Sequence, residues 1–325
     1  MVLDDLVYHV ADAMVDCLHL EAGGRVLVVH DTVSMPVAET IREAAQALGA
    51  HASLYNIDQH PRPLTRLPKG LASQLALGAD ATFYVAGVLP GELPFRSRLV
   101  REATRRGASH VHMPKATLEV LARVEGCRET AETVRRLHRA LEGSRVVSVE
   151  APGGTRIELA VGMYRWVADD GVIGRGEWKN WPPGEVYTTP TSAEGVIVVD
   201  GVLGSYFSTK YGLLQTPVRV EVSGGTIQSI SGGPIAGELL DYLSREACGL
   251  RIGELGIGGN PRIKRPIGNM LHDEKMPGAH IAAGDPLGGR TGAPWSCPVH
   301  VDMLPLRSTV RAGTTTLVRM GELLV

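Results

Sequence analysis

The chain has 325 residues, of which 44% are apolar and 21% are charged, a composition typical of a globular protein with room for two domains of ordinary size. Its formal charge of −2 excludes a strongly basic surface, so we expect neither a nucleic-acid nor a membrane partner. No apolar run reaches the ~18 residues that span a bilayer, and residues 1–6 lack the features of a signal peptide. We therefore expect a cytoplasmic protein.

Strands and helices alternate in the first half of the chain. Apolar runs such as residues 25–30 are typical of buried parallel strands, and apolar residues at helical spacing fill the segments between them. The pattern predicts βαβ units and a parallel, Rossmann-like sheet. The expected strands are 25–30, 51–57, 81–86 and 109–113, and the expected helices are 3–22, 36–49, 68–78, 94–107, 116–123 and 128–142.

The loop after the first expected strand does not have the composition of a phosphate-binding loop. Residues 31–36 contain no glycine, and neither G-x-G-x-x-G nor G-x-x-x-x-G-K-[ST] is present there. We therefore do not expect this half of the chain to bind a dinucleotide.

The pattern changes after residue 143 and becomes rich in strands and glycine. The sequence predicts an α/β domain with a parallel Rossmann-like sheet over residues 1–144, followed by a β-rich α+β metal-binding domain over residues 145–325. The expected elements of the second domain are hairpins at 146–160 and 218–230, strands at 196–200, 299–304 and 316–320, and a helix at 235–247.

Four cysteines are widely spaced and form no Cys-x-x-Cys pair. This spacing is untypical of a zinc ribbon or a disulfide scaffold, and it fits a reducing compartment. We expect Cys297 to be a packing residue. The other three are Cys17, Cys127 and Cys248.

His300 and Asp302 alternate with apolar residues in the strand expected at 299–304. Side chains at positions i and i+2 of a strand share one face about 7 Å apart, so this imidazole and carboxylate can converge on one cation. Glu254 lies in the apolar segment 252–257, where a buried carboxylate needs a cation or hydrogen bonds.

Glu185, Glu274 and His280 also lie within three residues of a glycine or proline in the second half. Carboxylates and imidazoles gathered from turns or strand ends of one domain suit divalent metals such as Zn, Mn, Co or Fe. Each residue alone has a simpler explanation, as a capping glutamate or a buried structural histidine.

Four motifs in order carry a resemblance to a known family. They are Gly-Glu-Val-Tyr-Thr-Thr-Pro at 184–190, Gly-Glu-Leu-Gly-Ile-Gly at 253–258, Asp-Glu-Lys followed by His-Ile-Ala-x-Gly at 273–284, and Val-His-Val-Asp at 299–302. The set resembles the M29 metallopeptidases, the aminopeptidase T group. The same superfamily also contains the 2,5-dihydroxypyridine 5,6-dioxygenases.

The resemblance implies a metal site and a hydrolytic reaction. It implies two divalent metals, Zn, Co or Mn, with a metal-activated water attacking an N-terminal peptide or similar amide bond. Glu254 or Glu274 would act as the catalytic acid–base. The implied metal ligands are Glu185, Glu254, His280, His300 and Asp302.

Two departures cast doubt on the peptidase reaction and leave the metal site intact, although Glu185 and Glu254 are both present and one iron would not need both as ligands. Leu287 stands where the aminopeptidases carry a tyrosine, and the segment between His280 and His300 is short. The alternative is therefore a ring-cleaving dioxygenase of a hydroxylated pyridine-type substrate. It would hold one Fe(II) through His280, His300 and Asp302. A binding module without turnover is a third possibility.

His112 and Arg290 are the predicted substrate-binding residues. His112 ends an expected parallel strand, where ligands bind in open α/β sheets, although His110 and His112 could simply be one buried and one solvated histidine. Arg290 lies in a glycine-flanked loop and could bind a substrate carboxylate, or be an ordinary surface arginine. We expect a short-peptide or small-molecule substrate, and a homodimer formed through the β-rich half.

Overall fold

The computed structural model describes residues 3–124 and 127–325. The chain forms two compact units, of which unit 1 is Met1–Ala131 with Asp170–Pro183 and unit 2 is Glu132–Asp169 with Gly184–Val325. This division differs from the single boundary predicted between residues 144 and 145, because the segment 170–183 returns to the first sheet.

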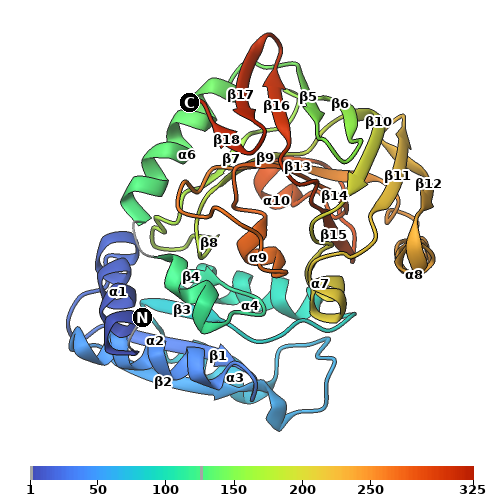
Figure 1. The fold of residues 1–325 in the computed structure, drawn as a ribbon. Coiled ribbons are helices and arrows are strands. Elements are labelled where there is room, and N and C mark those ends of the chain that lie inside the picture. Colours follow the sequence, from blue (N-terminus) through green and yellow to red (C-terminus); the bar gives the residue numbers. More distant parts are fainter. Residues whose placement is uncertain (1–2, 125–126) are drawn as a thin grey trace. The chain divides into compact units, whose positions relative to one another are not determined.

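Unit 1 contains a five-stranded parallel sheet in the order β2-β1-β3-β4-β8 (Figure 1). The returning strand β8 pairs with β4 although many residues separate the two in the chain. The strands are β1 (Arg25–His30), β2 (His51–Asn56), β3 (Ala81–Tyr84), β4 (Ser109–His112) and β8 (Trp178–Asn180). The helices are α1 (Leu3–Leu18), α2 (Met35–Ala47), η1 (Ile57–Gln59), α3 (Lys69–Ala76), α4 (Leu93–Arg105), α5 (Leu118–Leu121) and η2 (Ala122–Val124), and α6 (Cys127–Leu141) begins here.

Both faces of the parallel sheet are buried, as the continuous apolar strands predicted. Leu27 and Val29 of β1 pack in one cluster with Leu71 of α3 and Leu99 of α4. Val28 points to the opposite face and is fully buried. The unit is therefore a doubly covered α/β layer.

Unit 2 contains two antiparallel sheets. The larger has the order β12-β11-β10-β6-β5-β16-β17-β18, and the smaller has the order β15-β14-β13-β9-β7. The strands of the larger sheet are β5 (Val146–Glu150), β6 (Arg156–Ala160), β10 (Ser192–Val199), β11 (Val218–Ser223), β12 (Thr226–Ser231), β16 (Thr309–Ala312), β17 (Thr315–Arg319) and β18 (Glu322–Leu323). Those of the smaller sheet are β7 (Val167–Asp169), β9 (Glu185–Thr188), β13 (Ile252–Gly258), β14 (Gly278–Gly284) and β15 (His300–Met303).

One hydrophobic core joins the two sheets of unit 2 to α6 and to α8 (Gly233–Ser244). Leu159 and Val220 enter it from the larger sheet, and Leu255, Ile281 and Val301 enter it from the smaller one. Every second residue of the smaller sheet is thus committed to the core, which leaves the alternate residues on its other face. Three short helices complete the unit: α7 (Ser205–Tyr211), α9 (Met270–Asp273) and α10 (Gly288–Thr291).

The predicted fold class is confirmed, since a parallel α/β sheet precedes a β-rich α+β region. Both predicted hairpins form, through β5–β6 and β11–β12. The first helix ends at Leu18 and not at residue 22. Strands β7, β8, β9, β13, β14, β16 and β18 were not predicted.

The expectation that the cysteines form no disulfide is wrong for this structure. Cys17 pairs with Cys127 across a sequence separation of 110 residues, and Cys248 pairs with Cys297 across 49. The fold brings these pairs together, so spacing along the chain could not reveal them. Because disulfides are commoner in oxidising compartments, the cytoplasmic location stays a prediction.

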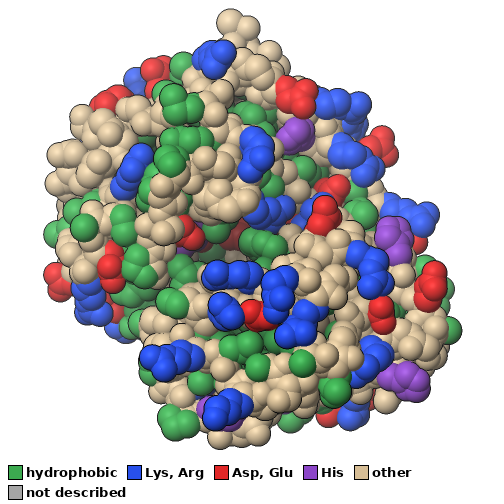
Figure 2. Space-filling view, turned by 180° about the vertical axis from the view of Figure 1, so that it is seen from behind, with side chains coloured by type: hydrophobic (Ala, Val, Ile, Leu, Met, Phe, Trp, Pro, Cys, Tyr) green, Lys and Arg blue, Asp and Glu red, His purple; other side chains and the backbone are tan. Residues whose placement is uncertain are grey.

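Within the part of the chain that the structure describes, no helix has both the length and the apolar character to cross a membrane. Lys and Arg side chains are interspersed with Asp and Glu over the face that Figure 2 shows, in agreement with the formal charge of −2.

Candidate metal centre

The smaller sheet of unit 2 carries the candidate ligands on the face opposite the core. Glu185 of β9, Glu254 of β13 and His280 of β14 alternate with core residues, and His300 and Asp302 do the same on β15. The strand expected from the His-x-Asp alternation is confirmed as β15. Glu185 begins β9 and so lies at a strand end as expected, whereas Glu254 and His280 lie inside β13 and β14.

Gly256 makes room for His280 at the centre of this face. The two residues are directly paired between β13 and β14. A Cβ atom at residue 256 would lie 2.0 Å from His280 Nε2, far inside van der Waals contact. The glycine therefore lets the imidazole lie flat over β13 and reach the carboxylates beyond it.

Four short distances connect the two imidazoles to the carboxylates. His280 Nε2 lies 3.3 Å from Glu185 Oε2 and 3.7 Å from Glu254 Oε1. His300 Nε2 lies 3.3 Å from Glu254 Oε2 and 3.2 Å from Asp302 Oδ1. The structure thus brings the five predicted metal ligands into one cluster.

Glu274 also belongs to this cluster. Among the residues that the structure describes, three sets of side chains have their ligand atoms within 4.8 Å of one another, and Glu274 forms one of the sets with His280 and Asp302. The other two sets are Glu185, Glu254 and His280, and Glu254, His300 and Asp302.

Lys275 is a residue of the cluster that the sequence did not identify. Its side chain is fully buried, and its ammonium contacts Glu185 Oε1 and lies 2.8 Å from Glu274 Oε1. The motif Asp-Glu-Lys placed a lysine next to a candidate ligand. Only the folded sheet shows that its charge points inward.

The carboxylates strongly perturb the titration of their neighbours. Burial opposes a charged imidazole, yet Asp302 and Glu254 raise the pKa of His300 to about 10. Glu185 and Glu254 likewise overcome burial and raise the pKa of His280 well above its usual value. Despite burial, Lys275 and His280 lower the pKa of Glu185 to about 2. Burial raises the pKa of Glu274 to about 8 in spite of Lys275.

This donor set fits a divalent cation. Buried carboxylates need positive charge, and here they draw it from imidazoles that would otherwise be neutral near pH 7. His300 Nδ1 lies 2.9 Å from the Asp285 carbonyl oxygen, a contact that orients Nε2 toward Asp302. A bound cation would supply the charge and leave both Nε2 atoms free to act as ligands.

Of the two predicted substrate-binding residues, one lies beside the cluster face and the other lies in unit 1. The Arg290 guanidinium lies over the ring of Tyr187 at 5.6 Å, and Tyr187 is on β9 two residues beyond Glu185, on the cluster face. His112 ends β4 in unit 1, where Arg96 Nη1 lies 3.2 Å from its Nε2 and can donate to it. His110 and His112 are both buried, so the simpler expectation of one solvated histidine is wrong.

Tyr187 and Asp169 are two further residues that the sequence did not indicate. Asp169 of β7 pairs directly with Glu185, and its charge helps to raise the pKa of Lys275. Neither β7 nor β9 has the length or pattern of a recognisable strand, so their side chains could not be assigned to a face beforehand.

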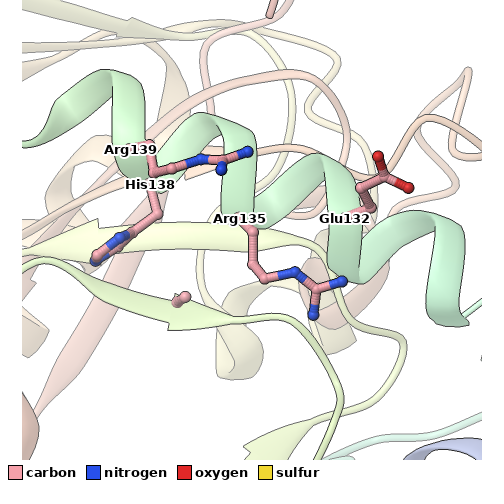
Figure 3. A pocket seen from close by; sticks show the side chains of 5 residues that line it. Glu132, Arg135, His138 and Arg139 are labelled. Atoms are coloured by element: carbon pink, nitrogen blue, oxygen red, sulfur yellow. The ribbon is translucent and has the colours of Figure 1, made fainter.

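A cavity of about 220 Å³ lies elsewhere on unit 2, between α6 and β7 (Figure 3). Arg135, His138 and Arg139 lie along it on α6, with Glu132, and Ala168 lines it from β7. None of the cluster residues lines this cavity, so it is separate from the candidate metal centre.

Two solved structures share the fold of the whole chain. The structure of 2,5-dihydroxypyridine dioxygenase from Pseudomonas putida KT2440 matches with a TM-score of 0.75 at 19% identity, covering 100% of this chain and 98% of that one. Wild-type AmpT from Thermus thermophilus matches with a TM-score of 0.75 at 17% identity, covering both chains completely. At these identities the likenesses show the fold alone.

The fold and the cluster define a two-unit protein with an α/β sheet and a candidate metal site in its β-rich unit. The sequence model of the 2,5-dihydroxypyridine 5,6-dioxygenases matches residues 6–283. The chain therefore belongs to the 2,5-dihydroxypyridine 5,6-dioxygenase family.

A curated relative agrees with this assignment. The 2,5-dihydroxypyridine 5,6-dioxygenase of Pseudomonas putida KT2440 is 28% identical over 241 residues, which are 68% of this chain. The match spans 65% of that protein's own length. The leading prediction from the sequence, an aminopeptidase-like hydrolase, is overturned by the family match, and the specific M29 assignment is not confirmed. The dioxygenase alternative accounts for these findings better.

Proposed function

We propose that this chain is a mononuclear Fe(II) dioxygenase that cleaves the ring of a hydroxylated pyridine-type substrate. Membership of the 2,5-dihydroxypyridine 5,6-dioxygenase family over residues 6–283 is the observation that carries the proposal. The name of the curated relative makes 2,5-dihydroxypyridine the first substrate to test.

His280, His300 and Asp302 would hold the iron, as the two-histidine, one-carboxylate set of non-haem Fe(II) oxygenases. All three lie on one face of the smaller sheet, and Asp302 is close to both imidazoles. Fe(II) bound there would supply the redox chemistry that lets dioxygen react with an aromatic ring.

The position of Lys275 supports one metal rather than two. A carboxylate that bridges two metals must offer one oxygen to each of them. Glu185 Oε1 already contacts the Lys275 ammonium, and Glu185 Oε2 faces His280. The buried lysine thus supplies the positive charge that a second metal would bring to Glu185 and Glu274.

Glu254 and Glu274 remain the proposed acid–base residues. Burial raises the pKa of Glu274 to about 8, so its carboxyl group can hold a proton near neutral pH. Burial also raises the pKa of Glu254, whose two oxygens face the two imidazoles. In its ionised form either group could accept the proton that a ring hydroxyl group releases, and in its protonated form it could return that proton.

Arg290 is proposed to bind the substrate, and the substrate-binding role of His112, in unit 1, stays a prediction from the sequence. Arg290 lies beside the cluster face and would attract an ionised ring oxygen. His112 has one ring nitrogen against Arg96, and burial lowers its pKa well below the usual value, so it would be a neutral hydrogen-bonding group. A homodimer formed through unit 2 is also proposed, and light scattering on the purified protein would test it.

Oxygen uptake by the purified protein tests the proposal. We expect uptake with 2,5-dihydroxypyridine after anaerobic loading with Fe(II), and none after loading with Zn(II). The variant His300→Ala should lose both bound iron and oxygen uptake. Absence of uptake with every hydroxylated pyridine tried, from protein that retains its iron, would remove the proposal.

A further inference from the structure

The hydroxyl group of Tyr187 is buried and has no hydrogen-bond partner among the described residues. The side chain is only 2% exposed. Buried tyrosine hydroxyls usually find a partner, because leaving one unbonded costs the full desolvation of that group. Other buried tyrosines follow this rule, since the hydroxyl of Tyr84 donates to the Gly87 carbonyl oxygen.

The side chain of Tyr187 lies on the same face of the smaller sheet as the candidate metal ligands. Tyr187 and Glu185 alternate with core residues on β9, so both side chains lie on the cluster face. Gly256 is the direct partner of Tyr187 on one side and of His280 on the other. The phenol and the imidazole therefore flank one glycine, and the His280 ring occupies the space where a side chain at residue 256 would lie.

The phenol of Tyr187 can donate a hydrogen bond near neutral pH, because a tyrosine hydroxyl ordinarily keeps its proton until about pH 10. The Arg290 guanidinium, 5.6 Å from the ring centre, adds a positive charge on the same side of the sheet. A neutral donor next to a guanidinium is suited to an oxygen that carries negative charge.

We propose that the Tyr187 hydroxyl group donates a hydrogen bond to a ring oxygen of the bound hydroxylated heteroaromatic substrate, and that it selects rings that carry this oxygen. The inference rests on the proposed function for the class of substrate. The ligand would then supply the hydrogen-bond acceptor that the Tyr187 hydroxyl group lacks among the described residues. A ring without that oxygen would leave the donor unbonded and bind more weakly.

Anaerobic binding separates this inference from turnover. The dissociation constant of 2,5-dihydroxypyridine would be measured by calorimetry without oxygen, for the iron-loaded wild type and for Tyr187→Phe. We expect the variant to bind about 10- to 100-fold more weakly, the range for losing a hydrogen bond to a charged group. The wild type should bind 2,5-dihydroxypyridine more tightly than it binds at least one of the two single-hydroxyl rings, 2-hydroxypyridine and 3-hydroxypyridine. Tyr187→Phe should lose that preference.

Two measurements exclude a structural explanation. Tyr187→Phe should keep its iron content and melt at or above the wild-type temperature, because the change removes a buried group without a partner. Tyr55→Phe is the matched control, since the Tyr55 hydroxyl lies 2.8 Å from His60 Nε2 in unit 1. That control should melt lower and bind the ligand as the wild type does.

The outcomes distinguish the two claims. Weaker binding by Tyr187→Phe supports the inference, even if the wild type takes up no oxygen and the proposed function fails. Equal binding by variant and wild type overturns the inference while oxygen uptake can still uphold the proposed function. Loss of iron from Tyr187→Phe would also overturn it, because the phenol would then be a metal ligand.

Discussion

Gly256→Ala is expected to displace His280 and weaken the metal centre. The added Cβ would lie 2.0 Å from Nε2 and 2.2 Å from Cε1 of the imidazole, whereas ordinary contact begins near 3.4 Å. The ring must therefore move by about 1.4 Å, the difference between 2.0 and 3.4 Å. Ligand geometry in functional sites has to be held within about 0.5 Å, so this movement is large.

The expected loss of metal affinity is at least about 10- to 100-fold, the range found when groups that orient metal ligands are altered. This corresponds to about 1.4–2.8 kcal/mol. The free energy of unfolding of the metal-free protein should fall by about 1–3 kcal/mol, because the added Cβ overpacks the buried ring of His280. Gly256 does not have the positive φ that would strain an alanine, and alanine is the better strand residue by roughly 0.5–1 kcal/mol.

Anaerobic titration with Fe(II), with chemical denaturation of the metal-free protein in parallel, measures both effects. Gly237→Ala in α8 is the matched control, because a Cβ there has no atom within 4 Å. It should bind iron like the wild type and gain up to about 1 kcal/mol of stability. Iron binding by Gly256→Ala with unchanged affinity would refute the role assigned to this glycine and to His280.

Two more predictions concern buried ion pairs. In Lys275→Met the carboxylates of Glu185 and Glu274 lose their cation, so the free energy of unfolding of the metal-free protein should fall by about 3–5 kcal/mol. The number of bound divalent ions should rise from one to two per chain. Native mass spectrometry would count the ions, and an unchanged count would contradict the charge argument. Glu92 is buried, and despite that burial the hydrogen bonds from Arg62 lower its pKa below the reference value of 4.5. The ionised carboxylate therefore contributes its full stabilisation of the folded protein above pH 4.5. This contribution is lost as the pH falls through the pKa of the folded state. Glu92→Gln should therefore be about 3–5 kcal/mol less stable than the wild type in urea at pH 7, with a smaller difference below pH 4; a constant difference would contradict the assignment.

Local sequence pattern was sufficient for part of the fold and part of the site. Strand β15 and the shared face of His300 and Asp302 follow from two-residue alternation, and the parallel strands follow from continuous apolar runs. These properties are set by neighbouring residues, so the sequence expresses them directly.

Features that depend on distant pairing could not be predicted. Strand β13 contains three glycines, which lower strand propensity, and Gly256 is explained only by the His280 ring from β14. Strand β8 pairs with β4, although α5, α6, β5, β6 and β7 lie between them in the chain. The two disulfides join cysteines that are 110 and 49 residues apart. Lys275 and Tyr187 also depend on distant pairing, because Lys275 contacts Glu185, 90 residues away in the chain, and Tyr187 pairs with Gly256 of β13.

The choice of reaction was the larger error, and its cause is chemical. The same carboxylates and imidazoles can serve one iron or two hydrolytic metals, so the motifs alone did not decide between them. Leu287 and the short segment before His300 cast doubt on the peptidase reaction, and the family match overturns that reaction.

Isotope incorporation tests the central claim most directly. The iron-loaded protein would convert 2,5-dihydroxypyridine under ¹⁸O₂, and the product would be examined by mass spectrometry. A ring-cleaving dioxygenase predicts that both atoms of one dioxygen molecule appear in a ring-opened product. Product formation without label from dioxygen, or with label from H₂¹⁸O alone, would contradict the account.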